Sequence, residues 1–150
     1  MPKPVFMLCC ETITVDDLTK LPSFIGVFNT LQITQGPVPG PLGGIPQAFI
    51  KIRISATWMR NDEDGGYDRY DYQFIVLPPG QEQVAPVFKS HFAFEGRFHR
   101  LDLTVQGHPF KDTGMYRIQC RIKRQNGGEW VSQEYPLCVE PGPASRPPAA

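Results

Sequence analysis

Apolar and polar residues alternate with a period of two along most of this chain, and this pattern limits its possible folds more than any other feature. The clearest case is AFIKIRISATWM at 48–59, where every second residue from Ile50 to Trp58 is apolar and the residues between them are polar. Successive side chains of a β-strand point to opposite faces, so the pattern predicts a strand with one buried face. Similar patterns predict strands at 5–10, 23–31, 70–77, 99–105, 115–123 and 135–139.

The segment 84–94 fits two patterns, because its apolar residues match a helical stripe as well as a strand. Pro86 and the alternation of Phe92 with Phe94 favour a strand, since proline fits poorly inside a helix. This segment brings the prediction to about eight strands, and the Asp-Gly and Asn-Gly sequences at 61–67 and 124–129 are typical of hairpin turns. We therefore predict an all-β, antiparallel β-sandwich of the immunoglobulin-like, Greek-key type, without a disulfide.

The chain has 150 residues, which is enough for one domain with a single core. We predict that this domain spans residues 1–140. Two segments are expected to lie outside the core. Residues 36–47 are rich in proline and glycine and predict a long loop, and residues 141–150 predict a flexible, Pro-rich tail.

The stretch DTGMYRIQC at 112–120 resembles the corner that leads into the last disulfide cysteine of an immunoglobulin domain. Such a corner forms when the tyrosine hydroxyl binds nearby backbone, and Asp112, Gly114 and Tyr116 have the required spacing. The disulfide cysteine would follow the tyrosine by two residues, where this chain has Ile118. The corner thus favours the sandwich, while Cys120 is predicted to be a buried thiol.

The chain contains the stretches LCCETITVDD, LPSFIGVFNTL, ISATWMRNDEDGG, FIVLPPG, FAF, DTGMYRIQCRI and YPLCV. Together these stretches are similar to one family, DUF6941, which comprises small bacterial proteins of unknown function. The resemblance covers most of residues 4–140 and implies a bacterial, cytosolic β-sandwich. It implies no activity, and no site residues follow from it.

Basic residues occupy the polar parity of two predicted strands, 48–59 and 115–123. If these strands are neighbours, as the third and sixth strands are in an immunoglobulin-like sheet, their side chains form one basic field. Such a field can bind phosphate, a nucleotide or an acidic partner, although an ordinary solvated sheet face has the same composition. No aromatic residue alternates with them, so nucleic acid is not expected. The candidate binding residues are Lys51, Arg53, Arg117, Arg121 and Lys123.

An acidic cluster surrounds the predicted turn at 61–67, and its oxygen atoms are the ligands that a hard cation such as Ca²⁺ requires. The candidate ligands are Asp62, Asp64 and Asp68. Short polar side chains also populate turns for backbone reasons alone. We adopt this second interpretation and predict no metal and no other cofactor.

Adjacent cysteines, Cys9 and Cys10, precede Glu11, and three histidines lie far along the chain. These are groups that nucleophilic catalysis uses, but nothing in the sequence brings them together. The chain lacks a phosphate-binding glycine loop, a G-x-S-x-G elbow and an H-E-x-x-H motif. We therefore predict that the cysteines are core residues and that the protein is not an enzyme.

Fifteen basic residues balance fifteen acidic ones, so no overall charge directs the chain to nucleic acid or to an anionic membrane. The apolar run from Val5 to Cys10 is shorter than a signal peptide or a membrane span requires, which predicts a cytoplasmic protein. Phe49, Phe98 and Trp130 are candidates for exposed interface aromatics.

These features lead to two hypotheses for function. The first is a non-enzymatic protein-binding or assembly module that contacts an unknown protein partner, or a second copy of itself, through a sheet face or edge. The alternative is a small-ligand sensor or enzyme that uses the basic face for an anion or nucleotide, or the acidic loop for a metal.

Overall fold

The computed structural model describes residues 1–33 and 51–142. Within these ranges the chain forms nine β-strands and no helix, which confirms the all-β prediction. The strands are β1 (Lys3–Val15), β2 (Pro22–Val27), β3 (Thr30–Ile33), β4 (Lys51–Met59), β5 (Arg69–Leu77), β6 (Phe88–Ala93), β7 (Phe98–Gln106), β8 (Gly114–Arg124) and β9 (Val131–Pro141). The predicted loop at 36–47, Phe49 and the last eight residues of the predicted tail lie outside the described ranges.

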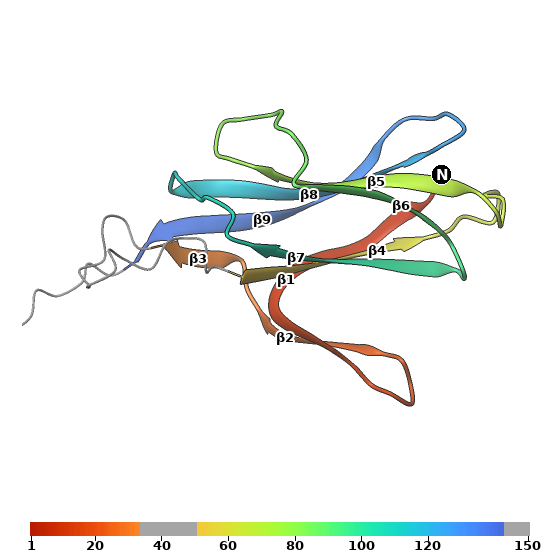
Figure 1. Ribbon diagram of the computed structural model, residues 1–150, viewed down its shortest axis with the longest axis horizontal. Helices are drawn as coiled ribbons and strands as arrows, with labels where there is room; N and C mark the ends of the chain where they lie inside the picture. The colour runs from red at the N-terminus through yellow and green to blue at the C-terminus, as the bar shows by residue number, and fades with distance from the viewer. Residues whose placement is uncertain (34–50, 143–150) are drawn as a thin grey trace, which may run out of the picture.

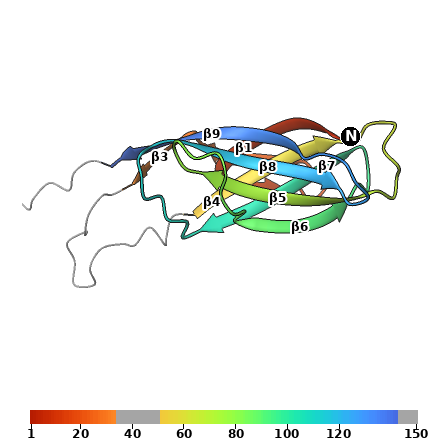
Figure 2. The same cartoon turned by 90° about the horizontal axis from the view of Figure 1, so that it is seen from above.

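The strands form two sheets that lie one above the other (Figures 1 and 2). Sheet A has the order β2-β1-β4-β7, and sheet B has the order β3-β9-β8-β5-β6. All neighbouring strands are antiparallel except β3 and β9, which are parallel. Antiparallel pairing therefore dominates, as the short connections predict.

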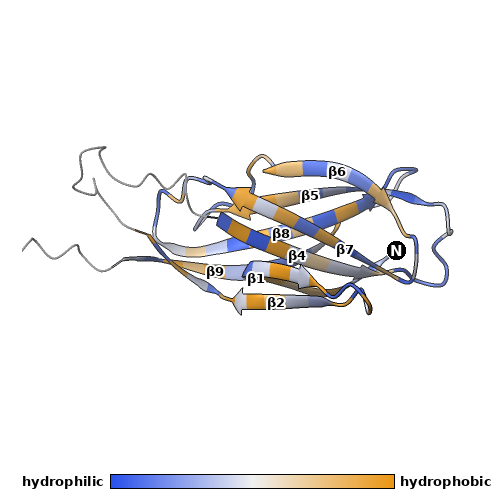
Figure 3. Ribbon diagram, turned by 60° about the horizontal axis from the view of Figure 1, so that its bottom comes forward, coloured by the Kyte–Doolittle hydropathy of each residue, from blue (hydrophilic) through white to orange (hydrophobic). Residues whose placement is uncertain are grey.

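One core lies between the sheets and is built from the inward parity of their strands. In β4, Ile52, Ile54 and Trp58 are almost completely buried, whereas Lys51, the first residue of the strand, is exposed. Figure 3 shows the same alternation of apolar and polar residues along the central strands. The core also takes inward residues from sheet B, namely Tyr70, Phe74, Val76, Tyr116, Ile118, Cys120 and Ile122.

The structure has nine strands in its described ranges, one more than the eight predicted. The difference arises at 23–31, predicted as one strand, where the chain forms β2 and β3 in different sheets. The chain crosses from sheet A to sheet B at Phe28 and Asn29. The Asn29 carbonyl accepts a hydrogen bond from the Cys138 N–H at 2.7 Å, which connects this crossing to β9.

The second half of β1 and the whole of β2 form a two-stranded arm that extends away from the body (Figure 1). At its tip, the Asp16 carboxylate accepts hydrogen bonds from the backbone N–H groups of Leu18 and Thr19 at 3.0 and 2.6 Å. Leu18 is 94% exposed and Leu21 is 65% exposed. The arm therefore presents apolar side chains that the core does not bury.

The two predicted hairpin turns have different outcomes. The turn at 124–129 joins β8 and β9, which pair in antiparallel register, and Gly127 and Gly128 adopt positive φ values of 112° and 124°. The turn at 61–67 is not a hairpin, because β4 and β5 belong to different sheets. The Asp-Gly sequence there supports a bend between sheets, which uses the same turn-forming residues.

The predicted tyrosine corner is present before β8. The Tyr116 hydroxyl donates a hydrogen bond to the Asp112 carbonyl at 3.0 Å and accepts one from the Asp112 N–H at 3.3 Å. Gly114 has a φ of +131°, and a Cβ atom there would lie 3.0 Å from Pro79, so only glycine fits without strain. The corner thus fixes the direction in which the chain enters β8.

Replacement of Tyr116 by phenylalanine tests the corner. We expect Tyr116→Phe to lower the free energy of unfolding by about 1 kcal/mol, because the partly buried Asp112 backbone groups lose their hydrogen-bond partner. Tyr67, which is 99% exposed, provides the control, and Tyr67→Phe is expected to have no effect. Denaturant unfolding measures both; equal midpoints for the two variants would contradict a stabilising role for the corner.

Candidate functional site

The two predicted basic strands lie in different sheets, so the expectation that they are neighbours is wrong. β4 lies between β1 and β7, and β8 lies between β9 and β5. The apolar faces of both strands are buried in the same core, which places their polar faces on opposite sides of the molecule. The predicted field is therefore divided: Lys51 and Arg53 lie on the outer face of sheet A, and Arg117, Arg121 and Lys123 lie on that of sheet B.

The two residues on sheet A differ in their exposure. Lys51 is exposed at the start of β4, opposite Gln106. Arg53 is half-buried, and in the sheet register it stands between Cys10 of β1 and Thr104 of β7. The outer face of sheet B brings more of the predicted residues together.

Arg121 is held in a fixed orientation on the outer face of sheet B. Its Nε and Nη2 atoms donate hydrogen bonds to the Gln73 Oε1 atom at 2.9 and 2.7 Å. Its guanidinium carbon lies 4.8 Å from the centre of the Trp130 ring, a cation–π distance. A guanidinium has five N–H donors, so three of them have no acceptor among the described residues. These donors are available to an acidic group.

A hollow of about 280 Å³ lies beside Arg121. Its floor includes Ile75 and Leu77, which are only 3% exposed although they have the outward parity of β5. The loop between β5 and β6 lies over them, and its Gln81 carbonyl accepts a hydrogen bond from Arg117 Nη2 at 3.3 Å. The hollow is lined by Ile75, Leu77, Glu82, Gln83, Val84, Gln119 and Arg121.

Charges of both signs surround the hollow. Arg117 Nη1 lies 3.6 Å from the Glu134 carboxylate, which also accepts a hydrogen bond from Gln119 at 2.9 Å. Lys123 stands opposite Asp71 in the sheet register. We call this surface, with Gln73, Arg121, Trp130 and the hollow at its centre, the Arg121 surface. It is polar and mixed in charge, unlike a uniformly basic field.

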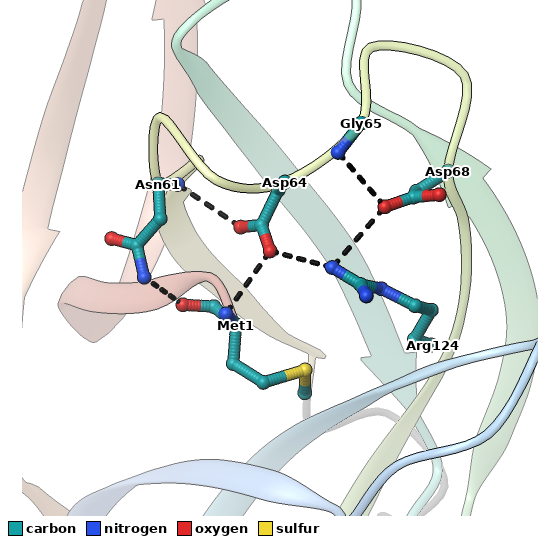
Figure 4. Close-up of polar contacts among 6 residues, drawn as sticks. All are labelled: Met1, Asn61, Asp64, Gly65, Asp68 and Arg124. Atoms are coloured by element: carbon teal, nitrogen blue, oxygen red, sulfur yellow. Dashed lines mark hydrogen bonds and ion pairs between the residues drawn. The ribbon is translucent and has the colours of Figure 1, made fainter.

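The acidic loop forms an ion-pair network with basic groups of the chain itself (Figure 4). The Asp64 side chain is 1% exposed, and its Oδ1 atom lies 3.0 Å from the Met1 ammonium and 2.7 Å from Arg124 Nη2. Its Oδ2 atom accepts a hydrogen bond from the Asn61 N–H at 3.0 Å. Asp68 contacts the same Arg124 atom at 3.2 Å.

This network occupies two of the three carboxylates that were candidate metal ligands, Asp64 and Asp68, while Asp62 is exposed. Within residues 1–33 and 51–142, no group of three or more His, Cys, Asp or Glu side chains is placed to hold a metal. The network instead fastens the first residue to the loop and to β8.

Asp64 gives the protein a specific dependence on pH. Burial alone would raise the pKa of this carboxyl, but the Met1 ammonium, the Asn61 N–H and the charge of Arg124 together hold the pKa below its usual value of 3.8. A lowered folded-state pKa contributes stability above the unfolded value, and this contribution is lost as the pH falls through the folded value.

Replacement of Asp64 by asparagine tests this contribution. We expect Asp64→Asn to cost about 2 kcal/mol of unfolding free energy at pH 7, because it removes a buried charge with three partners. The difference from the wild type should narrow as the pH falls below 3.8. Unfolding curves between pH 7 and pH 2 measure it, with Asp62→Asn as the exposed control. A difference that stays constant with pH would contradict this role.

The cysteines have the environment of core residues. Burial raises the pKa of Cys9 to about 12, with a further contribution from neighbouring Cys10, and burial raises the pKa of Cys120 to about 12. His99 stacks on Phe92 with ring centres 4.3 Å apart, and His108 packs against Phe110, so both imidazole rings pack against buried aromatic rings. All four cysteines are free thiols.

Alkylation tests these environments. At pH 8 a thiol with a pKa near 12 is about one ten-thousandth thiolate, so Cys9 and Cys120 should resist iodoacetamide in the folded protein. The half-buried Cys138 should react first. Mass spectrometry counts the modified sites, and denatured protein, which should be labelled at all four, is the control. Rapid labelling of Cys9 in the folded protein would contradict its burial.

The sequence predicted one of the residues that orient Arg121, Trp130, and missed the other, Gln73. Trp130 is 37% exposed, as its prediction as an interface aromatic requires, and Phe98 is 57% exposed. Gln73 was not predicted as a site residue. Its parity within the predicted strand at 70–77 was the available signal, because this parity places it on the outer face, opposite Arg121.

No protein-family model matches this chain, and comparisons with curated proteins and with solved structures found no match. In the part of the chain that the structure describes, no helix is long and apolar enough to cross a membrane.

Proposed function

We propose that this protein is a non-enzymatic protein-binding or assembly module, and that the Arg121 surface recognises an acidic group on a protein partner. The observation that carries the proposal is the fixed orientation of Arg121 by Gln73 and Trp130. An arginine that is already ordered loses little side-chain entropy on binding. Arginine and tryptophan are also the residue types that contribute most binding energy at protein interfaces.

The composition of the surface favours a protein partner over a free anion. Glu82 and Glu134 lie close to the arginines, so a free phosphate would meet carboxylates as well as guanidinium groups. A protein interface, in contrast, commonly has an apolar centre and a polar rim of both charges. Ile75 and Leu77 line the hollow, and the exposed Trp130 ring supplies apolar surface beside Arg121.

The alternative is a sensor that binds a small anion in the hollow beside Arg121. A volume of about 280 Å³ suits a ligand with few atoms, and three guanidinium N–H groups are available to it. This alternative shares Arg121 with the first proposal but does not require Trp130 to contact the partner.

We also propose a finer description of the fold, an immunoglobulin-like Greek-key sandwich. The strand order β1-β4-β7 opposite β9-β8-β5-β6 and the tyrosine corner before β8 support it. Membership in DUF6941 and a cytoplasmic location remain proposals that rest on the sequence.

An experiment with two variants tests the function. Purified wild-type protein, immobilised and exposed to an extract of its native host, is expected to retain a stoichiometric protein partner. Arg121→Ala and Trp130→Ala should each weaken this interaction by about tenfold or more, because each removes half of the cation–π pair. Arg69→Ala is the matched control, since Arg69 is an exposed arginine elsewhere on β5.

The outcomes separate the two candidates. Loss of the partner in both variants, with retention by Arg69→Ala, supports the module. Retention by all variants would exclude the Arg121 surface as the binding site. If no partner binds, and inorganic phosphate or a nucleotide raises the melting temperature of the wild type but not of Arg121→Ala, the small-anion sensor is favoured.

A further inference from the structure

β7 is a regular strand at one end of sheet A. All nine of its residues pair with β4, from Phe98 opposite Met59 to Gln106 opposite Lys51, without a register shift. Among the described residues, no strand pairs with its other edge. Exposed strand edges usually carry a proline, a bulge or lysines that prevent pairing with another chain. The sequence FHRLDLTVQ contains no proline and no lysine, and the strand has no bulge.

The core is incompletely covered along this edge. Leu103 and Val105 have the inward parity of β7, yet both are only half-buried. With Phe88 of β6 and the preceding residue Val87 they line a hollow of about 400 Å³, and Phe88 is 41% exposed. An added strand at β7 would cover these apolar side chains and would also satisfy the backbone groups of the edge.

The charges of β7 select the strand that fits best. Arg100 and Asp102 lie on the outer face, where they form an ion pair of 2.8 Å, and Asp102 accepts a hydrogen bond from Ser55 at 2.7 Å. In antiparallel pairing of β7 with another copy of itself, directly opposite residues must have the same parity. A register centred on residue 100 would place the two copies of Arg100 opposite each other, and one centred on residue 102 would do the same with Asp102. The register centred on Leu101 instead places each Arg100 opposite Asp102 of the other copy.

We propose that the partner at this edge is a second copy of the chain, and that two molecules associate by antiparallel pairing of β7 about a two-fold axis at Leu101. The pairing is isologous, so each copy contributes the same residues, as is usual for dimers of identical chains. It joins the two copies of sheet A into one continuous sheet. The proposal is independent of the proposed function, because the Arg121 surface lies on sheet B.

Charge exchange tests the register. The wild type should show a dimer mass in sedimentation or light scattering at micromolar to millimolar concentration. In the dimer of Arg100→Asp, two carboxylates face each other at both of the 100–102 pairs. In the dimer of Asp102→Arg, two guanidinium groups face each other at both pairs. Each variant alone should therefore dimerise at least tenfold more weakly. An equimolar mixture of the two variants should recover the dimer, because both opposed pairs are then of opposite charge.

Cross-linking provides a second test, which does not depend on Asp102→Arg folding without its Ser55 hydrogen bond. In the proposed register Phe98 stands opposite Thr104 of the other copy, and both are exposed on the outer face. The double variant Phe98→Cys with Thr104→Cys should form disulfide-linked dimers on oxidation. Each single variant provides a matched control and should not, because its new cysteines lie far apart in the dimer.

The dimer mass and the cross-linking can each support or overturn the proposal. Recovery of the dimer in the mixed charge variants, or specific cross-linking of the double cysteine variant, supports the proposal. A monomeric wild type at every concentration would overturn it, as would a dimer that survives Arg100→Asp unchanged. Arg121→Ala should leave the mass unchanged, so failure of the proposed function does not affect this result.

Discussion

The packing of β4 against β8 is the interaction on which the rest of the structure depends. Trp58 of β4 lies beside Cys120 of β8, and both are completely buried between the sheets. Because each of these strands is central in its sheet, this contact holds the two sheets face to face and commits every second residue to the core. The outward residues of the two strands are thereby placed on opposite surfaces. Arg121 and Arg53 consequently have separate surroundings, although both have the outward parity of their strands.

Polar interactions complete this arrangement at places where the core cannot reach. The Asp64 network fastens the beginning of the chain to the bend between β4 and β5 and to β8. The Tyr116 hydroxyl fixes the entry of β8 at the opposite end of that strand. Each interaction satisfies backbone or charged groups that would otherwise lose hydration without compensation. β8 is thus held at both ends by polar contacts and along its length by burial.

The sequence predicted which residues face inward better than which strands are neighbours. Alternation identified Ile54, Trp58 and Cys120 as core residues, because side-chain parity is a local property of a strand. Parity cannot tell whether two strands lie side by side or face to face, and the predicted pairing of the basic strands failed for this reason. The hollow at Arg121 was equally inaccessible, since it depends on a loop that folds over Ile75 and Leu77. Ion pairing between Asp64 and the distant Met1 and Arg124 likewise requires the complete fold.

The parallel pairing of β3 with β9 has a consequence for biosynthesis. Residues 30–33 pair with residues 138–141, so sheet B receives its edge strand from an early part of the chain and the neighbouring strand from a late one. During translation β3 remains unpaired with β9 until more than a hundred further residues have been made. Once β8 has been made, it also lacks β9 until residues 131–141 follow, although its other neighbour, β5, is already available. Such long-range pairing slows folding, and the nascent chain exposes unpaired strand edges that a chaperone can bind before the ribosome releases it.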